Sequence, residues 1–447
     1  MAPNPDFVLC DPGHLEKEVE TTTTGLFKTV TLSSDSELEE LTENLDDDQR
    51  LALGLVLNYA RQLKISRSKP EKVNPPMLVV QGGAGAGKSL LIKSMGQWFE
   101  KELQQSGDDP NKPYVLITAF TGTAAANVDG MTLHSAFNFN FGNEFLSLGD
   151  KIRDAKREQL KNLRIVIIDE FSMLKADMFY QLDLRLRELK QNTEEVFGGC
   201  SLILLGDILQ LRPVMGRYIF EQPLCVDYHL PHLIDPLWMK MQVLLLTFNH
   251  RQGEDFAYAE ILNRLRSGSH TDADCKILEQ RVRPTNHPDI PTDALFIICT
   301  NAGVNARNEI MLENMEGDCV SFKAQVTRAG KAMNNPKKSR DGAIFNTPLQ
   351  SNLNLKIGAQ VMLTFNVDVM DSLTNGTIGH VIGYERTSEG TVQDILVQFQ
   401  NEKSGRERRK KVSTELARKF PNNLVTPISL LNFASICQKA LHPKMIS

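Results

Sequence analysis

The segment Gln81-Gly82-Gly83-Ala84-Gly85-Ala86-Gly87-Lys88-Ser89 decides the fold of this chain. It satisfies the pattern G-x-x-x-x-G-K-[ST] of a phosphate-binding loop. The apolar run at residues 77–80 predicts a buried strand before it, and the residues from Leu90 onward predict a helix after it. A glycine-rich turn between a strand and a helix surrounds phosphates with backbone N–H groups and the positive end of the helix dipole. The sequence therefore predicts a nucleoside triphosphate site, and this context disfavours a glycine-rich turn without a ligand.

Each residue of this loop has an expected role. Lys88 would reach the β- and γ-phosphates, and the Ser89 hydroxyl would ligate Mg²⁺. The backbone that curls around the phosphates belongs to Gly82, Gly83, Ala84, Gly85, Ala86 and Gly87. We expect ATP and Mg²⁺ as the cofactors.

A second predicted strand ends in two carboxylates. Residues 164–168 are a β-branched run typical of a central parallel strand, and Asp169 and Glu170 follow it directly. Ligands of open α/β sheets lie at the carboxyl ends of the strands. Asp169 is therefore expected to hold Mg²⁺ and Glu170 to orient and deprotonate a water, whereas a solvated acidic turn is the alternative. Because water would accept the phosphoryl group, the sequence predicts an ATPase.

A third predicted strand, residues 201–205, leads into Gly206-Asp207-Ile208-Leu209-Gln210-Leu211-Arg212-Pro213-Val214. The Gln210 amide could hydrogen-bond a γ-phosphate and respond to its loss, although an isolated glutamine would favour a plain surface loop. The pattern Gly206-Asp207-x-x-Gln210-Leu211-x-Pro213 resembles motif III of superfamily 1 helicases.

Further segments resemble other motifs of those helicases. They are Leu45-Asp46-Asp47-Asp48-Gln49 (the Q-type motif), Thr118-Ala119-Phe120-Thr121-Gly122-Thr123-Ala124-Ala125 (Ia), Gly130-Met131-Thr132-Leu133-His134-Ser135 (Ib), Ile168-Asp169-Glu170-Phe171-Ser172-Met173 (II) and Asn249-His250-Arg251-Gln252 (IV). The stretches at 355–363 and 375–379 are similar to later family segments. Over roughly residues 40–380 the chain resembles the PIF (petite integration frequency) DNA helicases, the RecD-like branch that moves 5′ to 3′ on single-stranded DNA.

The resemblance implies a function and further site residues. It implies two RecA-like P-loop domains and an ATP-dependent helicase that translocates on single-stranded DNA and unwinds duplex junctions. Telomere maintenance, recombination and repair, or mobile-element replication, are the processes it implies. Gln49 would contact adenine, and Arg251 would stabilise charge on the γ-phosphate. Thr121, Gly122, Thr132 and His134 would hold DNA phosphates, although Thr132 and His134 could instead cap and brace a loop.

The chain divides into three predicted parts. Residues 1–40 are expected to be a disordered acidic tail, and residues 41–245 an α/β domain with a small insertion near 137–160. In that insertion the alternating Phe137, Phe139 and Phe141 could stack bases or simply pack, and a charged helix follows at 151–161. The helix at 178–189 is expected to make core contacts only.

Residues 246–447 are expected to form the second domain. They contain a predicted buried strand at 294–299 and a β-rich insertion near 376–412 with strands at 380–384 and 395–399. The basic runs at 406–411 and 337–340 could contact phosphates, form a solvated surface strand or serve nuclear import. The family's T-x-H-K-x-Q-G and A-L-S-R segments are not found before Ser447, so we expect a truncated second domain that binds ATP and DNA but hydrolyses and unwinds poorly.

Composition narrows the protein class. Hydrophobic residues make up 41% and charged residues 23% of 447 residues, which is typical of a globular protein of several domains. The net charge of −5 requires any DNA contact to be a local groove. Seven cysteines without a C-x-x-C pair, no apolar run of about 18 residues and no signal core predict a nuclear or cytoplasmic protein, neither secreted nor membrane-bound. A mitochondrial presequence does not fit the acidic start.

Two other functions compete with a helicase. One is an ATP- and DNA-binding fragment without unwinding activity. The other is an unrelated P-loop enzyme such as a GTPase or small-molecule kinase. The guanine signature N-K-x-D is not present, since Asn111-Lys112-Pro113-Tyr114 lacks the Asp, and a kinase would leave the long second domain without a role.

Overall fold

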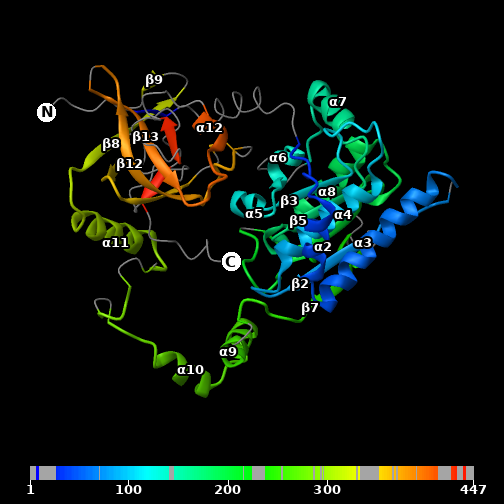
Figure 1. Ribbon diagram of the computed structural model, residues 1–447, viewed down its shortest axis with the longest axis horizontal. Helices are drawn as coiled ribbons and strands as arrows, with labels where there is room; N and C mark the ends of the chain where they lie inside the picture. The colour runs from blue at the N-terminus through cyan, green and yellow to red at the C-terminus, as the bar shows by residue number, and fades with distance from the viewer. Residues whose placement is uncertain are drawn as a thin grey trace. The chain divides into compact units, whose positions relative to one another are not determined.

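The computed structural model divides the chain into two compact units, Thr24–His287 with Ser447 and Met1–Thr23 with Pro288–Ile446 (Figure 1). The structure describes residues 7–9, 27–69, 71–139, 145–214, 216–223, 237–252, 255–284, 287–291, 294, 296–328, 331–332, 352–364, 367–368, 371–388, 390–410, 424–429 and 436–438. Within these residues no helix is both long enough and apolar enough to cross a membrane.

The first unit is built on a six-stranded parallel sheet with the strand order β4-β3-β5-β6-β2-β7. Its strands are β2 (Met77–Gly82), β3 (Val115–Ala119), β4 (Met131–Thr132), β5 (Ile165–Asp169), β6 (Ser201–Gly206) and β7 (Gln242–Leu246). The β-branched and leucine-rich runs pair because both faces of the sheet are covered, so apolar side chains are buried whichever way they point. This confirms the predicted α/β class.

Alternate residues of each central strand enter two separate cores. In β2, Val79 packs into one apolar cluster, whereas Leu78 and Val80 pack into the other. Helices α3 (Asp47–Ser66) and α4 (Lys88–Leu103) cover the second face, and α6 (Leu133–Phe137) and α8 (Ala176–Lys190) cover the first. Short α5 (Gly122–Asn127), η1 (Phe171–Met173), η2 (Val196–Gly199) and η3 (Leu237–Lys240) connect these elements. This sandwich fixes the carboxyl ends of β2, β3, β5 and β6 at one edge.

The prediction of a disordered tail is wrong for residues 35–40. Residues 35–43 form helix α2 (Asp35–Glu43), which begins with a capping box between Ser34 and Glu37. Leu38 is fully buried, and the Trp98 indole of α4 donates a hydrogen bond to Thr42 Oγ1 at 2.7 Å. One apolar side chain on the inner face and a cap outweigh the acidic composition. Residues 1–6 and 10–26 lie outside the described residues.

The small insertion contains the predicted charged helix, α7 (Asp150–Gln159). Phe137 and Phe139 are buried in the core on the α8 side of the sheet. Of the two alternatives, these two rings therefore pack in the core and do not stack on bases. Phe141 lies outside the described residues. The helix predicted at 178–189 is α8, and its Leu182, Leu186 and Leu189 are core residues as predicted.

Two helices follow β7 within the same unit, α9 (Phe256–Ser267) and α10 (Asp272–Glu279). They are joined by a two-point ion pair, in which Arg264 Nε and Nη2 donate to Asp274 at 2.8 and 2.7 Å. The compact unit thus extends past the predicted boundary at residue 245.

The second unit is rich in antiparallel strands. Its five-stranded sheet has the order β14-β13-β12-β11-β15, formed by β11 (Gln360–Leu363), β12 (Ile378–Arg386), β13 (Val392–Phe399), β14 (Val425–Ser429) and β15 (Ile436–Gln438). A second sheet contains β1 (Phe7–Leu9), β8 (Val320–Arg328), β9 (Lys331–Ala332) and β10 (Asn352–Leu355). Helix α11 (Asn301–Glu313) comes directly before β8 in the chain. The two strands predicted at 380–384 and 395–399 are confirmed, and the β-rich part extends beyond 376–412 on both sides.

Two other expectations for this unit differ from the structure. The described residues of 294–299 form no strand, and Ile297 is 56% exposed. An apolar run becomes a buried strand only where neighbouring strands pair with it, and no described strand does so here. The basic run at 406–411 begins as the short helix α12 (Arg406–Lys410), not as a surface strand, because the Asp371 carboxylate accepts from Glu407 N and Arg408 N. The run at 337–340 lies outside the described residues.

Candidate nucleotide-binding site

The phosphate loop connects β2 to α4 as predicted. Gly85 and Gly87 have φ of 84° and 70°, in the left-handed region that glycine occupies without a steric cost. Lys88 Nζ donates to the carbonyl oxygens of Gly82 and Gly83 at 2.9 and 3.0 Å. Burial lowers the pKa of Lys88, while the nearby Glu170 and Asp169 act in the opposite direction. The Lys88 ammonium group thus lies against its own loop, where the phosphate of a bound nucleotide would replace these carbonyl contacts.

Two carboxylates end β5 beside this lysine. Burial, and secondarily the charge of Glu170, raises the pKa of Asp169 to about 7. Burial also raises the pKa of Glu170, whose φ of 57° is left-handed. That conformation costs a non-glycine residue about 1–2 kcal/mol and is typical of functional sites. A buried and a half-buried carboxylate, both of raised pKa, fit a cation, which would add positive charge beside them.

The segment after β6 is locked to the phosphate loop through Gln81. Gln81 Nε2 donates to Asp207 Oδ1 at 2.8 Å, and Ile208 N donates to Gln81 Oε1 at 3.1 Å. Asp207 is fully buried, and its carbonyl accepts the N–H of Gln210 at 2.9 Å. The predicted γ-phosphate sensor Gln210 therefore sits on a turn whose base is fixed beside the loop.

The segment after β7 lies against the same loop. His250 N donates to the Gly85 carbonyl oxygen at 2.9 Å. A Cβ at Gly85 would stand 2.5 Å from Asn249 Oδ1 and 2.6 Å from Arg251 Cβ, so only glycine admits this approach. The positive charge of Arg251 also acts to lower the pKa of Lys88. Arg251 is thus brought to the phosphate loop, as the predicted charge-stabilising role requires.

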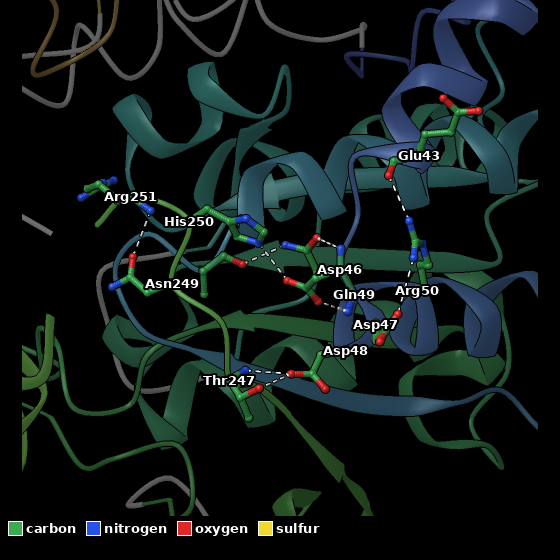
Figure 2. A network of polar contacts seen from close by, with 11 residues as sticks. Glu43, Asp46, Asp47, Asp48, Gln49, Arg50, Thr247, Asn249, His250 and Arg251 are labelled. Atoms are coloured by element: carbon green, nitrogen blue, oxygen red, sulfur yellow. Dashed lines mark hydrogen bonds and ion pairs between the residues drawn. The ribbon is translucent and has the colours of Figure 1, made fainter. Parts of the chain in front are cut away.

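The amino end of α3 holds this segment in place (Figure 2). His250 Nε2 lies 2.8 Å from Asp46 Oδ2, and Asp48 Oδ2 accepts from Thr247 N and Oγ1 at 2.9 and 2.6 Å. Gln49 is fully buried: its amide oxygen accepts from Asp46 N at 3.0 Å, and its Nε2 donates to the Ala86 carbonyl at 2.9 Å. These contacts connect the Q-type segment to both the loop and motif IV. Adenine contact by Gln49 stays a prediction.

The predicted DNA-binding residues gather at the carboxyl ends of β3 and β4. Thr121 caps α5 by accepting from Ala124 N, and Thr132 caps α6 by accepting from Ser135 N, both at 3.2 Å. Thr132 is only 5% exposed, and the His134 ring makes edge contacts with Phe120 and Phe139. The capping role of both threonines is therefore realised in the structure. DNA contact by Thr121, Gly122, Thr132 and His134 stays a prediction.

Ser89 and Asp169 are the residues that would hold Mg²⁺. Ser89 is the second residue of α4, and Asp169 is the buried carboxylate at the end of β5. Magnesium in phosphate sites uses one or two protein carboxylates together with phosphate oxygens and water, so this donor set fits.

Arg266 and several contacts between motif residues have no signal in the sequence. Asp207 receives Nε and Nη2 of Arg266 at 2.7 and 2.5 Å, and Arg266 comes from α9, 59 residues further along the chain. The contacts of Gln81 and the pair His250–Asp46 were also missed. Only the three-dimensional pairing of β2, β6 and β7 brings these residues together.

Comparison with known proteins agrees with this geometry. A family model described as PIF1-like helicase matches residues 61–274, and one described as DNA helicase Pif1, 2B domain, matches residues 344–384. The ATP-dependent DNA helicase PIF1 of Candida albicans is 31% identical over 315 residues, which cover 69% of this chain and 33% of that protein. The mouse protein of the same name is 31% identical over 69% of this chain and 44% of its own length.

The fold is similar as well. A crystal structure of Pif1 helicase from Candida albicans matches with a TM-score of 0.56 and 26% identity, covering 79% of this chain and 75% of that one. The chain spans a third to a half of the length of the curated PIF1 proteins named above. The two family models, the relatives and the shared fold lead to one conclusion: this chain belongs to the PIF1-like helicase family.

Proposed function

We propose that this protein is an ATP-dependent DNA helicase that couples ATP hydrolysis to 5′-to-3′ movement on single-stranded DNA. One observation supports it most. The charges of Glu170 and Arg251, which come from two other segments of the chain, act on Lys88 of the phosphate loop. A P-loop lysine, a carboxylate near a water position and an arginine are the parts that phosphoryl transfer to water requires.

The residues would divide the work as follows. Lys88 and the loop N–H groups bind the β- and γ-phosphates, and Ser89 with Asp169 holds Mg²⁺. Glu170 accepts a proton from the attacking water, Gln210 responds to the γ-phosphate, and Arg251 stabilises the charge that develops on it. Thr121 and His134 would contact DNA phosphates. We expect the protein to act in the nucleus on telomeric, recombining or damaged DNA.

Unwinding of two tailed duplexes tests this proposal. One substrate carries a single-stranded 5′ tail and the other a 3′ tail, with identical duplex parts. Whatever the rate of strand separation, we expect it to require ATP and to occur on the 5′-tailed substrate only, with none by Lys88→Ala. Equal unwinding of both substrates would contradict the direction. ATP turnover without unwinding of either would identify a DNA-binding ATPase that lacks helicase activity.

A further inference from the structure

An ion pair between the buried Asp207 and the partly exposed Arg266 connects helix α9 to the segment that carries Gln210. Asp207 at the end of β6 is fully buried, and Arg266 of α9 reaches it with Nε and Nη2 at 2.7 and 2.5 Å. Such a two-point pair fixes direction as well as distance, because the guanidinium is planar and its donors are fixed. The position of α9 and that of the motif III segment are therefore tied.

Asp207 has further donors on the side of the phosphate loop. Gln81 Nε2 and Leu209 N donate to its Oδ1 at 2.8 and 3.1 Å. Burial acts to raise the pKa of Asp207, but the hydrogen bonds from Arg266 and Leu209 outweigh it and hold the pKa below its ordinary value. The carboxylate thus stays charged at the centre of four donors, and removal of one donor leaves a buried charge less well compensated.

The segment that leads into α9 and carries Arg251 also contacts the phosphate loop. Arg251 stands beside Gly85, and α9 begins at Phe256, a few residues later. The stretch is therefore held at the phosphate loop by its first residues and at motif III by Arg266. A shift of motif III on binding or loss of a γ-phosphate would displace α9, since the connection is a packed, charge-paired contact.

Resting on the function proposed above, we propose that Arg266 is a positioning residue that lets bound nucleotide change the protein's affinity for single-stranded DNA. In this role Arg266 acts through another residue and not by contact with nucleotide or DNA. It acts through Asp207, which sets the turn carrying Gln210. Coupling of this kind has typical values of about 5–150-fold in affinity.

Matched lysine substitutions on α9 test this role. Arg266→Lys keeps the charge but loses the two-point contact, and Arg264→Lys makes the same change at the pair with Asp274, away from the nucleotide site. The measurement is the dissociation constant of a fluorescent single-stranded oligonucleotide, followed by anisotropy with and without a non-hydrolysable ATP analogue and Mg²⁺. Analogue binding and the thermal unfolding midpoint are measured for each variant.

In the wild type and Arg264→Lys, the analogue should change oligonucleotide affinity by at least about fivefold. In Arg266→Lys the factor should fall below about twofold, with analogue affinity in the absence of DNA retained. Should Arg266→Lys unfold, the double variant Arg266→Gln with Asp207→Asn removes both charges of the pair, so that no buried charge is left without its partner, and should lose the same factor. A wild-type factor in a folded Arg266 variant would overturn the inference. A wild type that binds neither analogue nor oligonucleotide would overturn the proposed function itself.

Discussion

At the scale of single residues, the site depends on a lysine that already has partners. Lys88 Nζ donates hydrogen bonds to the carbonyl oxygens of Gly82 and Gly83. Its lowered pKa reflects burial, so its charge is poorly solvated and a phosphate would compensate it. The two carbonyl contacts fix the position of the ammonium group within the loop.

Lys88→Ala should therefore weaken binding of ATP with Mg²⁺ by about a hundredfold or more, since a charge-assisted contact to phosphate is lost. Lys93→Ala on the same helix is the control. Lys93 Nζ lies 3.6 Å from Asp129 Oδ2, so this variant should bind ATP as the wild type does. Titration calorimetry measures both. Equal ATP affinity in the wild type and Lys88→Ala would rule out the assignment of this loop.

Residue positions were predictable where a short motif carries them, and the roles of these residues stay predictions. The loop, Asp169 and Glu170 follow strands whose apolar runs are plain in the sequence, so their positions were predicted correctly. The pair of Asp207 with Arg266 was not predictable, because an arginine on a helix 59 residues away has the same local pattern as any solvated arginine.

At the scale of elements, α2 shows how little apolar surface an ordered helix needs. Its composition is acidic, yet the capping box of Ser34 stabilises its first turn, Leu38 is fully buried, and the hydrogen bond from Trp98 to Thr42 attaches it to α4. Lys101 Nζ adds an ion pair to Asp35 at 2.7 Å. Average charge predicted a tail here because it weighs every position equally, whereas one buried position decides the outcome.

Leu38→Ala should release α2, at a cost of about 2–5 kcal/mol for loss of a fully buried leucine. Hydrogen exchange measures this directly. Amides of residues 37–43 should be protected in the wild type and exchange freely in the variant. Leu32→Ala, at a 36% exposed leucine before the helix, should leave them protected. Unprotected wild-type amides would instead support the tail that composition predicts.

A buried carboxylate of α4, which accepts hydrogen bonds at the start of β3, makes stability depend on pH. Glu100 Oε2 accepts from Tyr114 N and Val115 N at 2.9 and 3.0 Å, and burial raises its pKa to about 7. The folded state therefore binds a proton that the unfolded state has already lost above its ordinary pKa. This stabilisation is complete below the unfolded pKa and disappears as the pH rises through about 7.

The free energy of unfolding should fall by about 1 kcal/mol from this group between pH 6 and 8. Glu100→Gln, which stays neutral, should remove that part of the pH dependence. Glu100→Ala should destabilise at both pH values, because it leaves two buried backbone N–H groups without an acceptor. Denaturant titrations at the two pH values measure these effects, and an unchanged pH dependence in Glu100→Gln would contradict the assignment.

At the scale of the whole molecule, the parallel sheet was the most predictable part. Its strands are continuous apolar runs, and their pairing follows from burial on both faces. The second unit was predicted less well, because antiparallel strands of mixed polarity such as β12 and β13 give weaker patterns. The run at 294–299 has the composition of a buried strand, but whether it pairs depends on neighbours that no local pattern specifies.

The central claim is that one unit, Thr24–His287, contains a nucleotide site whose use depends on DNA. Steady-state ATP turnover by the whole chain, with and without a single-stranded oligonucleotide, tests it most directly. We predict that the oligonucleotide raises wild-type turnover by about tenfold or more, the equivalent of about 1.4 kcal/mol in barrier height. Glu170→Gln and Arg251→Ala should each remove most of this turnover while still binding ATP. Turnover that DNA leaves unchanged, or a wild-type rate in Glu170→Gln, would contradict the account.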